Sequence, residues 1–221
     1  MDTSWSSEIR GKRHRRPILR PRMLKPSEQY RAEAIHWHTL GDTYNALGMA
    51  HRALVCYKRS RSLAQKAGEP ESQRENDWTV LTKVGKAYQA LGQTRCAISY
   101  HVDSLHIARI MGDTERQLEA LLHLSIVYNT LGYIHHAMAC YLQRLSLYRK
   151  QGDRVSEALV LADLGRGYDT LGNIDEAIDL CEQSLVLARE IRNRRTESIA
   201  LTFLGMAYGH FGDVGRMQNY V

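Results

Sequence analysis

The chain has 221 residues, of which 43% are hydrophobic and 24% are charged, and its net charge is +6. These fractions are ordinary for a chain that folds in water, and no apolar run approaches the roughly 18–20 residues needed to cross a bilayer. The first residues, Met1–Trp5, lack the apolar stretch of a secretory signal. The composition therefore predicts neither a membrane span nor a signal peptide.

The excess of positive charge lies at the N-terminus. Residues 1–31 hold nine Lys and Arg against three acidic residues, whereas the remainder holds 21 of each sign. Because residues 1–26 contain three prolines and no apolar period, we expect them to form a disordered basic tail. Its densest cluster consists of Lys12, Arg13, Arg15 and Arg16. Such clusters bind nuclear import receptors, nucleic acid or anionic membranes, or simply stay solvated, and these alternatives remain open.

Amphipathic segments follow the tail. The first expected helix begins with Ser27 as N-cap and ends near Leu47, where Gly48 suits the left-handed C-terminal position. A second helix follows, and Gly68–Ser72 is predicted to be a solvated turn. The later helices are expected at 78–91, 94–110, 114–131 and 134–150, then as a hairpin within 154–193, and finally at 195–211.

Polar residues at the expected helix starts can accept free backbone N–H groups. Asp113 and Asp153 each follow a glycine that ends the preceding helix, so we expect both to act as caps. Asn173, with Glu176 three residues later, resembles a capping box.

The helices share a repeated pattern. A small residue recurs in steps of 44, 40, 40 and 40 residues, at Gly41, Gly85, Ser125, Gly165 and Gly205. A tyrosine follows three residues after each of them, and an alanine follows twelve residues after the first four. Because glycine inside a helix costs about 1 kcal/mol relative to alanine, its recurrence indicates close helix packing. The period predicts an all-α solenoid of antiparallel helix hairpins with about four and a half repeats.

This pattern divides the chain into the basic tail, 1–26, and a solenoid, 27–221. The expected repeats are 34–77, 78–113, 114–153, 154–193 and a partial repeat at 194–221, and the four extra residues of the first step are assigned to the turn at 68–72. The last hairpin lacks most of its second helix. A frayed end, a covering partner, association through this open end, or a longer protein of which the chain is a fragment would each account for it.

The landmarks of the first hairpin carry a resemblance to a known family. They are Trp37, Leu40-Gly41, Tyr44, Leu47-Gly48, Ala53 and Tyr57. This pattern resembles the tetratricopeptide repeat, whose repeats are usually about 34 residues long. The 40-residue spacing is similar to the long-repeat subgroup that includes the G-protein signalling modulator scaffolds and many bacterial multi-repeat proteins. The resemblance implies a right-handed superhelix whose first helices line a concave, peptide-binding groove.

Transferred position by position, the resemblance implies three groove residues from each of four repeats. They are His38, Asp42 and Asn45; Thr82, Lys86 and Gln89; Leu122, Ile126 and Asn129; and Ala162, Arg166 and Asp169. The G-protein signalling modulator scaffolds carry an asparagine directly after the Leu-Gly pair. This chain does not, so their partners cannot be assumed for it. Nor do these positions reproduce the set of Lys, Asn and Arg residues by which chaperone-binding members of the family hold a terminal carboxylate. A merely solvated polar helix face remains the alternative at each position.

No catalytic pattern is present. The sequence contains no HExxH, no GxxxxGK and no GxSxG, and the ten histidines are scattered. The four cysteines lie in second helices without a CxxC pair, so we expect buried reduced thiols rather than a metal site. Reduced thiols favour the cytoplasm, and the basic tail leaves the nucleus open. We expect no cofactor.

The sequence thus predicts a non-enzymatic scaffold, of the signalling-adaptor kind, that binds a protein or peptide partner in the groove. The alternatives are binding of nucleic acid or an anionic surface through the tail, and a regulatory fragment of a larger protein. Nucleic acid is disfavoured because Trp5 is the only aromatic residue of the tail that could stack on a base.

Overall fold

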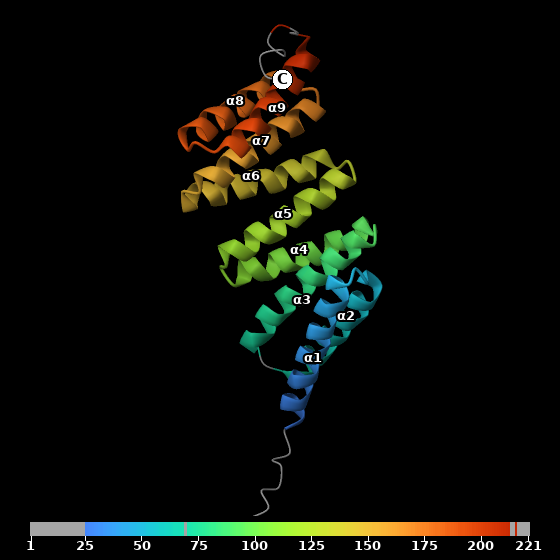
Figure 1. Ribbon diagram of the computed structural model, residues 1–221. Coiled ribbons are helices and arrows are strands. Elements are labelled where there is room, and N and C mark those ends of the chain that lie inside the picture. Colours follow the sequence, from blue (N-terminus) through green and yellow to red (C-terminus); the bar gives the residue numbers. More distant parts are fainter. Residues whose placement is uncertain (1–24, 69, 213–214, 216–221) are drawn as a thin grey trace, which may run out of the picture.

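The computed structural model describes residues 25–68, 70–212 and 215. Within these ranges the chain forms nine α-helices and no strand (Figure 1). The helices are α1 (Pro26–Ala46), α2 (Ala50–Ala67), α3 (Pro70–Ala90), α4 (Thr94–Ile110), α5 (Thr114–Thr130), α6 (Ile134–Gln151), α7 (Arg154–Thr170), α8 (Ile174–Glu190) and α9 (Arg194–Phe211). None of the described helices is both long and apolar enough to cross a membrane.

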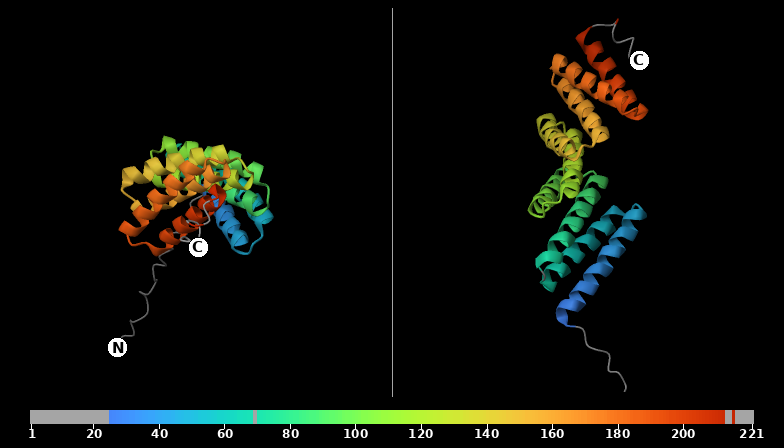
Figure 2. Two further views of the ribbon diagram at one scale, coloured as in Figure 1. Left: turned by 90° about the horizontal axis from the view of Figure 1, so that it is seen from above. Right: turned by 90° about the vertical axis from the view of Figure 1, so that its left-hand side faces the viewer.

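The helices form an elongated stack of antiparallel hairpins. Each helix packs against the next one in the chain, and α7 also packs against α9. The colours of Figure 1 run in order along the stack, and Figure 2 shows successive hairpins rotated about its long axis. This arrangement confirms the predicted all-α solenoid, in which the core is built between neighbours in sequence.

The recurrent glycines allow the two helices of a hairpin to approach closely. A Cβ atom at Gly41 would lie 2.5 Å from Cε1 of Tyr57, and one at Gly85 would lie 2.5 Å from Cε1 of His101. Both rings are buried, with exposures of 1% and 0%. The residue sixteen positions after each glycine therefore fills the space that the missing side chain leaves. Burying a ring of this size contributes roughly 1.5–3 kcal/mol.

The helix starts agree with the predicted caps at the aspartates. The carboxylate of Asp113 accepts from the backbone N–H of Arg116 at 3.0 Å, and that of Asp153 accepts from Ser156 at 3.1 Å. Asn173 occupies the N-cap of α8, but its side chain makes no capping hydrogen bond, so the predicted capping box is wrong.

Two boundaries near the N-terminus also differ from the prediction. Ser27 is not the N-cap, because α1 begins at Pro26 with Lys25 as its cap. A proline suits the first helical position, where its fixed φ is helical and no N–H is required. For the same reason α3 starts at Pro70, so the expected turn at 68–72 is wrong. The extra residues lengthen α3 to 21 residues, whereas α5 has 17.

The cysteines differ from one another in burial. Cys56, Cys140 and Cys181 are buried as expected, and all four thiols are free. Cys96 is exposed, which corrects the expectation of a buried thiol there. It lies in the first turn of α4, ahead of the position at which Ala97 packs into the core.

Candidate functional site

The predicted groove residues lie on α1, α3, α5 and α7, and we call the side of these helices that carries them the first-helix face. Not all of them are accessible. Thr82 is 3% exposed and Ala162 is fully buried, so neither can contact a partner, and their assignment is corrected. Leu122 and Ile126, in contrast, are exposed to 38% and 45%.

The first cluster on this face is built around Asp42. Both of its carboxylate oxygens accept from Nζ of Lys83, at 2.6 and 2.7 Å, and one accepts from the hydroxyl of Tyr57 at 2.9 Å. Burial alone would raise the pKa of Asp42, but the hydrogen bonds from Lys83 and Tyr57 outweigh it and lower the pKa. His38 lies 2.8 Å from the same Nζ, and burial, followed by the charge of Lys83, lowers its pKa. The charge of Asp42 is therefore already compensated within the chain.

The second cluster joins α3 to α4 and α5. Nζ of Lys86 donates to Glu119 at 2.7 Å. Beneath this pair, His101 stacks on His123 with ring centroids 5.0 Å apart, and its Nε2 lies 3.0 Å from Oε1 of Gln89. Burial, reinforced by the charges of His123 and Lys86, lowers the pKa of His101 to about 3. Both rings are neutral near neutral pH, because burial also lowers the pKa of His123.

The third cluster is centred on the hydroxyl of Tyr141. Asn129 donates to it from Nδ2 at 2.6 Å, and a guanidinium nitrogen of Arg166 lies 3.5 Å away. Arg166 also lies 3.9 Å from Asp163 and over the ring of Phe203, 5.7 Å from its centroid. Its guanidinium is thus oriented by α6, α7 and α9, yet none of these polar contacts is short.

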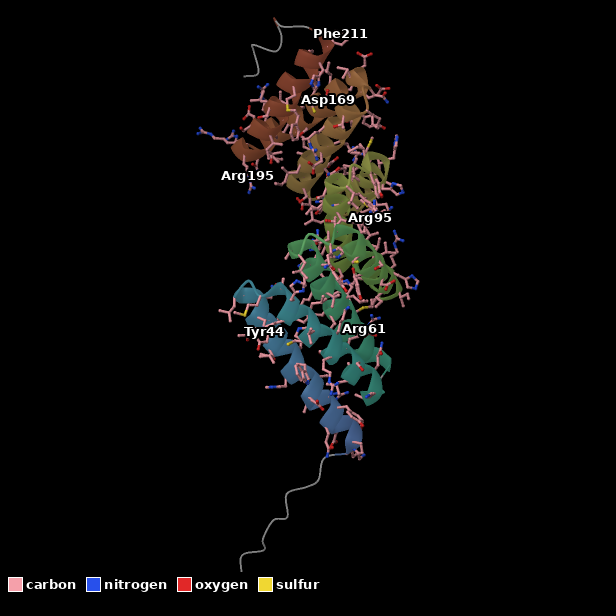
Figure 3. All side chains as sticks on the ribbon, turned by 90° about the vertical axis from the view of Figure 1, so that its right-hand side faces the viewer. Tyr44, Arg61, Arg95, Asp169, Arg195 and Phe211 are labelled. Carbon is pink, nitrogen blue, oxygen red and sulfur yellow. The ribbon has the colours of Figure 1, made fainter. Side chains whose placement is uncertain are left out.

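The fourth cluster joins α7 to α9. Asp169, labelled in Figure 3, lies with Oδ1 2.8 Å from Nδ1 of His210. The Asp169 side chain is 8% exposed, whereas that of His210 is 60% exposed. Asn45, the remaining predicted groove residue, is exposed on α1.

Sequence reasoning missed three residues that lie beside the charged groups of this face. Lys83, His123 and Asp163 share one position, two residues before the recurrent small residue, and each lies beside a predicted groove residue or its partner. The repeat period places them in one column, so that signal was present. The pairing of Lys83 with Asp42 could not be predicted, because the two residues are 41 positions apart on α3 and α1. The other two pairs, His123–Glu119 and Asp163–Arg166, are four and three residues apart within one helix, a spacing that the sequence does show.

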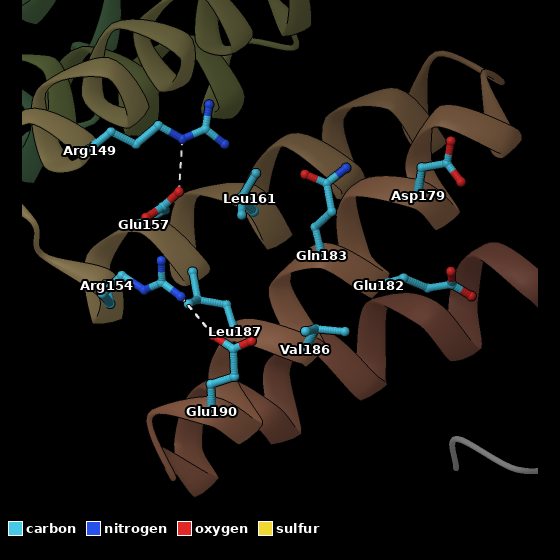
Figure 4. Close-up of a pocket in the computed structure, with 10 residues that line it drawn as sticks. All are labelled: Arg149, Arg154, Glu157, Leu161, Asp179, Glu182, Gln183, Val186, Leu187 and Glu190. Atoms are coloured by element: carbon cyan, nitrogen blue, oxygen red, sulfur yellow. Dashed lines mark hydrogen bonds and ion pairs between the residues drawn. The ribbon is translucent and has the colours of Figure 1, made fainter.

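A separate cleft of about 500 Å³ lies between α6, α7 and α8 (Figure 4). Its lining includes the apolar residues Leu161, Val186 and Leu187 together with both acidic and basic side chains. The ion pairs Arg149–Glu157, at 2.8 Å, and Arg154–Glu190, at 2.7 Å, close one side. None of the predicted groove residues lines this cleft.

The basic cluster of the tail, Lys12, Arg13, Arg15 and Arg16, lies outside the described residues. Among the residues that the structure describes, no group of three or more His, Cys, Asp or Glu side chains could hold a metal ion.

Residues 160–195, which run from the middle of α7 through α8 to the first residues of α9, match the tetratricopeptide repeat family. No curated protein sequence matches the chain. Several solved structures resemble it over most of both chains. BtubC (BKLC) from P. vanneervenii is 18% identical with a TM-score of 0.71, and the alignment covers 89% of this chain and 84% of that one. A putative kinesin light chain with nearly identical TPR-like repeats from Podosopora anserina is 20% identical with a TM-score of 0.68, covering 90% and 93%.

A third structure is that of a Rap protein complexed with Competence and Sporulation Factor. It is 17% identical to this chain with a TM-score of 0.58, and the alignment covers 85% of this chain and 52% of the Rap protein. The chain therefore spans about half of that protein. The structural similarity establishes a shared fold. At sequence identities this low it establishes no more than that, so function has to be argued from the residues themselves.

Proposed function

We propose that this chain, which is built of tetratricopeptide repeats, is a non-enzymatic scaffold that binds a peptide or helix of a partner protein on its concave first-helix face. The observation that carries this proposal is the exposure of Leu122 and Ile126, at 38% and 45%, on one side of α5. Leaving aliphatic side chains of this size exposed to water is unfavourable. Contiguous exposed apolar residues mark interaction surfaces, whereas isolated ones are common on any protein.

The charges around these residues favour a sequence-specific partner. The position occupied by Ile126 in its repeat carries Asp42, Lys86, Arg166 and Met206 in the others. A face whose chemistry changes from one repeat to the next can distinguish one extended segment from another. The Rap protein described above offers a precedent, because a factor binds to a protein of similar fold. In this proposal residues 27–221 form the binding unit and residues 1–26 a separate basic tail.

The test compares two aspartate variants of the full chain. Ile126→Asp places a charge on the first-helix face, whereas Val186→Asp makes the same kind of change at a residue that is 59% exposed on α8. A partner protein captured by the wild type should be lost from the first variant and retained by the second. Helical circular dichroism checks that both remain folded. Retention by Ile126→Asp together with loss from Val186→Asp would place binding in the cleft of Figure 4 and overturn the proposal.

A further inference from the structure

We infer that the bound segment carries an apolar side chain with a carboxylate close beside it, and that it docks across α5 and α7 on Leu122, Ile126 and Arg166. This inference rests on the proposed function and specifies the chemistry of the partner.

Most charged groups of the first-helix face are already engaged by short contacts within the chain. Asp42 is held by Lys83 through both oxygens, at 2.6 and 2.7 Å, and Lys86 is paired with Glu119 at 2.7 Å. Asp169 is buried beside His210. A partner that used any of these groups would have to replace an existing ion pair, which leaves little net gain.

Arg166 differs from these groups. Its closest polar contacts are 3.5 Å to the hydroxyl of Tyr141 and 3.9 Å to Asp163, although a guanidinium offers five N–H donors in a fixed plane. The side chain is 35% exposed, and Phe203 lies against the guanidinium. A planar cation that is oriented but weakly hydrogen-bonded is suited to two parallel hydrogen bonds with a carboxylate.

The apolar residues lie next to this cation. Asn129 of α5 and Arg166 of α7 both approach the hydroxyl of Tyr141 on α6, at 2.6 and 3.5 Å, so the two side chains share one partner. Ile126 precedes Asn129 by three residues and Leu122 by seven, so all three lie on one side of α5. A ligand side chain on Leu122 and Ile126 is therefore one helical turn away from the residue that shares a partner with Arg166.

These observations favour an acidic–apolar segment over a basic one. A basic segment would meet Arg166 with a like charge. On α5 it would find Ile126, which offers it no negative partner. Asp163 is a poor competitor for Arg166, because its oxygen lies 3.9 Å from the guanidinium nitrogen, beyond the length of a hydrogen bond. An external carboxylate can approach Arg166 from solvent.

The experiment selects peptides from a random twelve-residue library displayed on phage, using the full chain as bait. We expect enrichment of peptides with Leu, Ile or Phe within about two residues of Asp or Glu. For a synthetic peptide of this kind, measured by fluorescence anisotropy, Ile126→Asp and Arg166→Gln should each weaken binding by about tenfold or more. Val186→Asp should leave it unchanged.

Exchanging the charges of Arg166 and of the peptide separates a lost contact from a folding defect, because a misfolded variant could not regain binding. A peptide in which lysine replaces the acid should no longer bind the wild type. The same lysine peptide should bind the Arg166→Glu variant, which the acidic peptide does not. If the library instead yields peptides without acids, whose affinity falls with Ile126→Asp but not with Arg166→Gln, that result would overturn this inference and leave the proposed function standing. Enrichment of no peptide, or binding that ignores both substitutions, would overturn the proposed function as well.

Discussion

The thiol of Cys181 on α8 lies directly against Gly165 on α7. A Cβ atom at Gly165 would clash with this sulfur and would also lie 2.9 Å from the carbonyl oxygen of Ala177. Gly167, two residues along the same helix, faces only the flexible side chain of Met138, whose Cγ would lie 3.1 Å from an added Cβ. Two glycines of one helix therefore serve different purposes.

We predict opposite effects for alanine at these two positions. Alanine gains about 1 kcal/mol over glycine in a helix, but overpacking a rigid core costs about 1–3 kcal/mol. Gly165→Ala should therefore lower the free energy of unfolding by up to about 2 kcal/mol, whereas Gly167→Ala should leave it unchanged or raise it. Denaturant titrations followed by circular dichroism measure both, and equal midpoints would refute the proposed role of Gly165.

The buried His101 predicts a specific dependence of stability on pH. Its pKa is about 3 in the folded chain, against an ordinary value of 6.5. Between these values the unfolded chain binds more protons than the folded one, so stability should fall as the pH drops below 6.5. Above pH 6.5 this contribution is fully retained. Each unit of pKa difference is worth about 1.4 kcal/mol, so the total loss should be several kcal/mol.

Replacing His101 by tyrosine should reduce this pH dependence, because tyrosine occupies the equivalent positions, Tyr57 and Tyr141, in two other repeats. His106→Gln, at an exposed position of the same helix, is the matched control and should keep the wild-type slope. Thermal unfolding between about pH 7 and pH 4 compares the variants. If His101→Tyr retains the full slope, another group dominates acid unfolding.

The N-caps of α7 and α8 provide a direct contrast. Asp153 accepts a backbone hydrogen bond from Ser156, and hydrogen bonds with the side chain and backbone of Ser156 lower its pKa, whereas Asn173 makes no such bond. Asp153→Ala should cost about 1 kcal/mol and Asn173→Ala distinctly less. The aspartate contribution should be present above its unfolded pKa and disappear as the pH falls through the lower folded value. Equal losses at neutral pH would contradict this difference.

Native-state labelling should separate the cysteines. Cys96 is exposed and should react rapidly with a maleimide, because its thiol is accessible. Burial raises the pKa of Cys140 to about 11 and that of Cys181 to about 12, so few thiolates form there. Mass spectrometry after brief labelling should find one modified thiol, and Cys96→Ser should remove it. Rapid modification of several sites would contradict the described packing.

The sequence was sufficient to predict the hairpin stack because its signals are local and repeated. Glycine ends, aspartate caps and apolar periodicity placed most helix boundaries within a few residues. The start of α3 was missed because Pro70 was interpreted as part of a turn, although proline also favours the first position of a helix.

The candidate site was only partly predictable. The repeat period predicted which positions share the first-helix face. The charge pairs on that face depend on contacts between residues far apart in the sequence. Asp42 and Lys83 are 41 positions apart, and Lys86 and Glu119 are 33 apart. Burial of Thr82 likewise depends on how closely neighbouring hairpins approach, which the period alone does not define.

The packing of each helix mainly on its neighbours in sequence has a mechanical consequence. Small changes of angle at successive interfaces add along such a stack, so its two ends can move relative to each other while every local interface is preserved. The solenoid should therefore behave as a spring. A segment bound across α5 and α7 would stiffen its middle, and the position of α1 relative to α9 would report that stiffening.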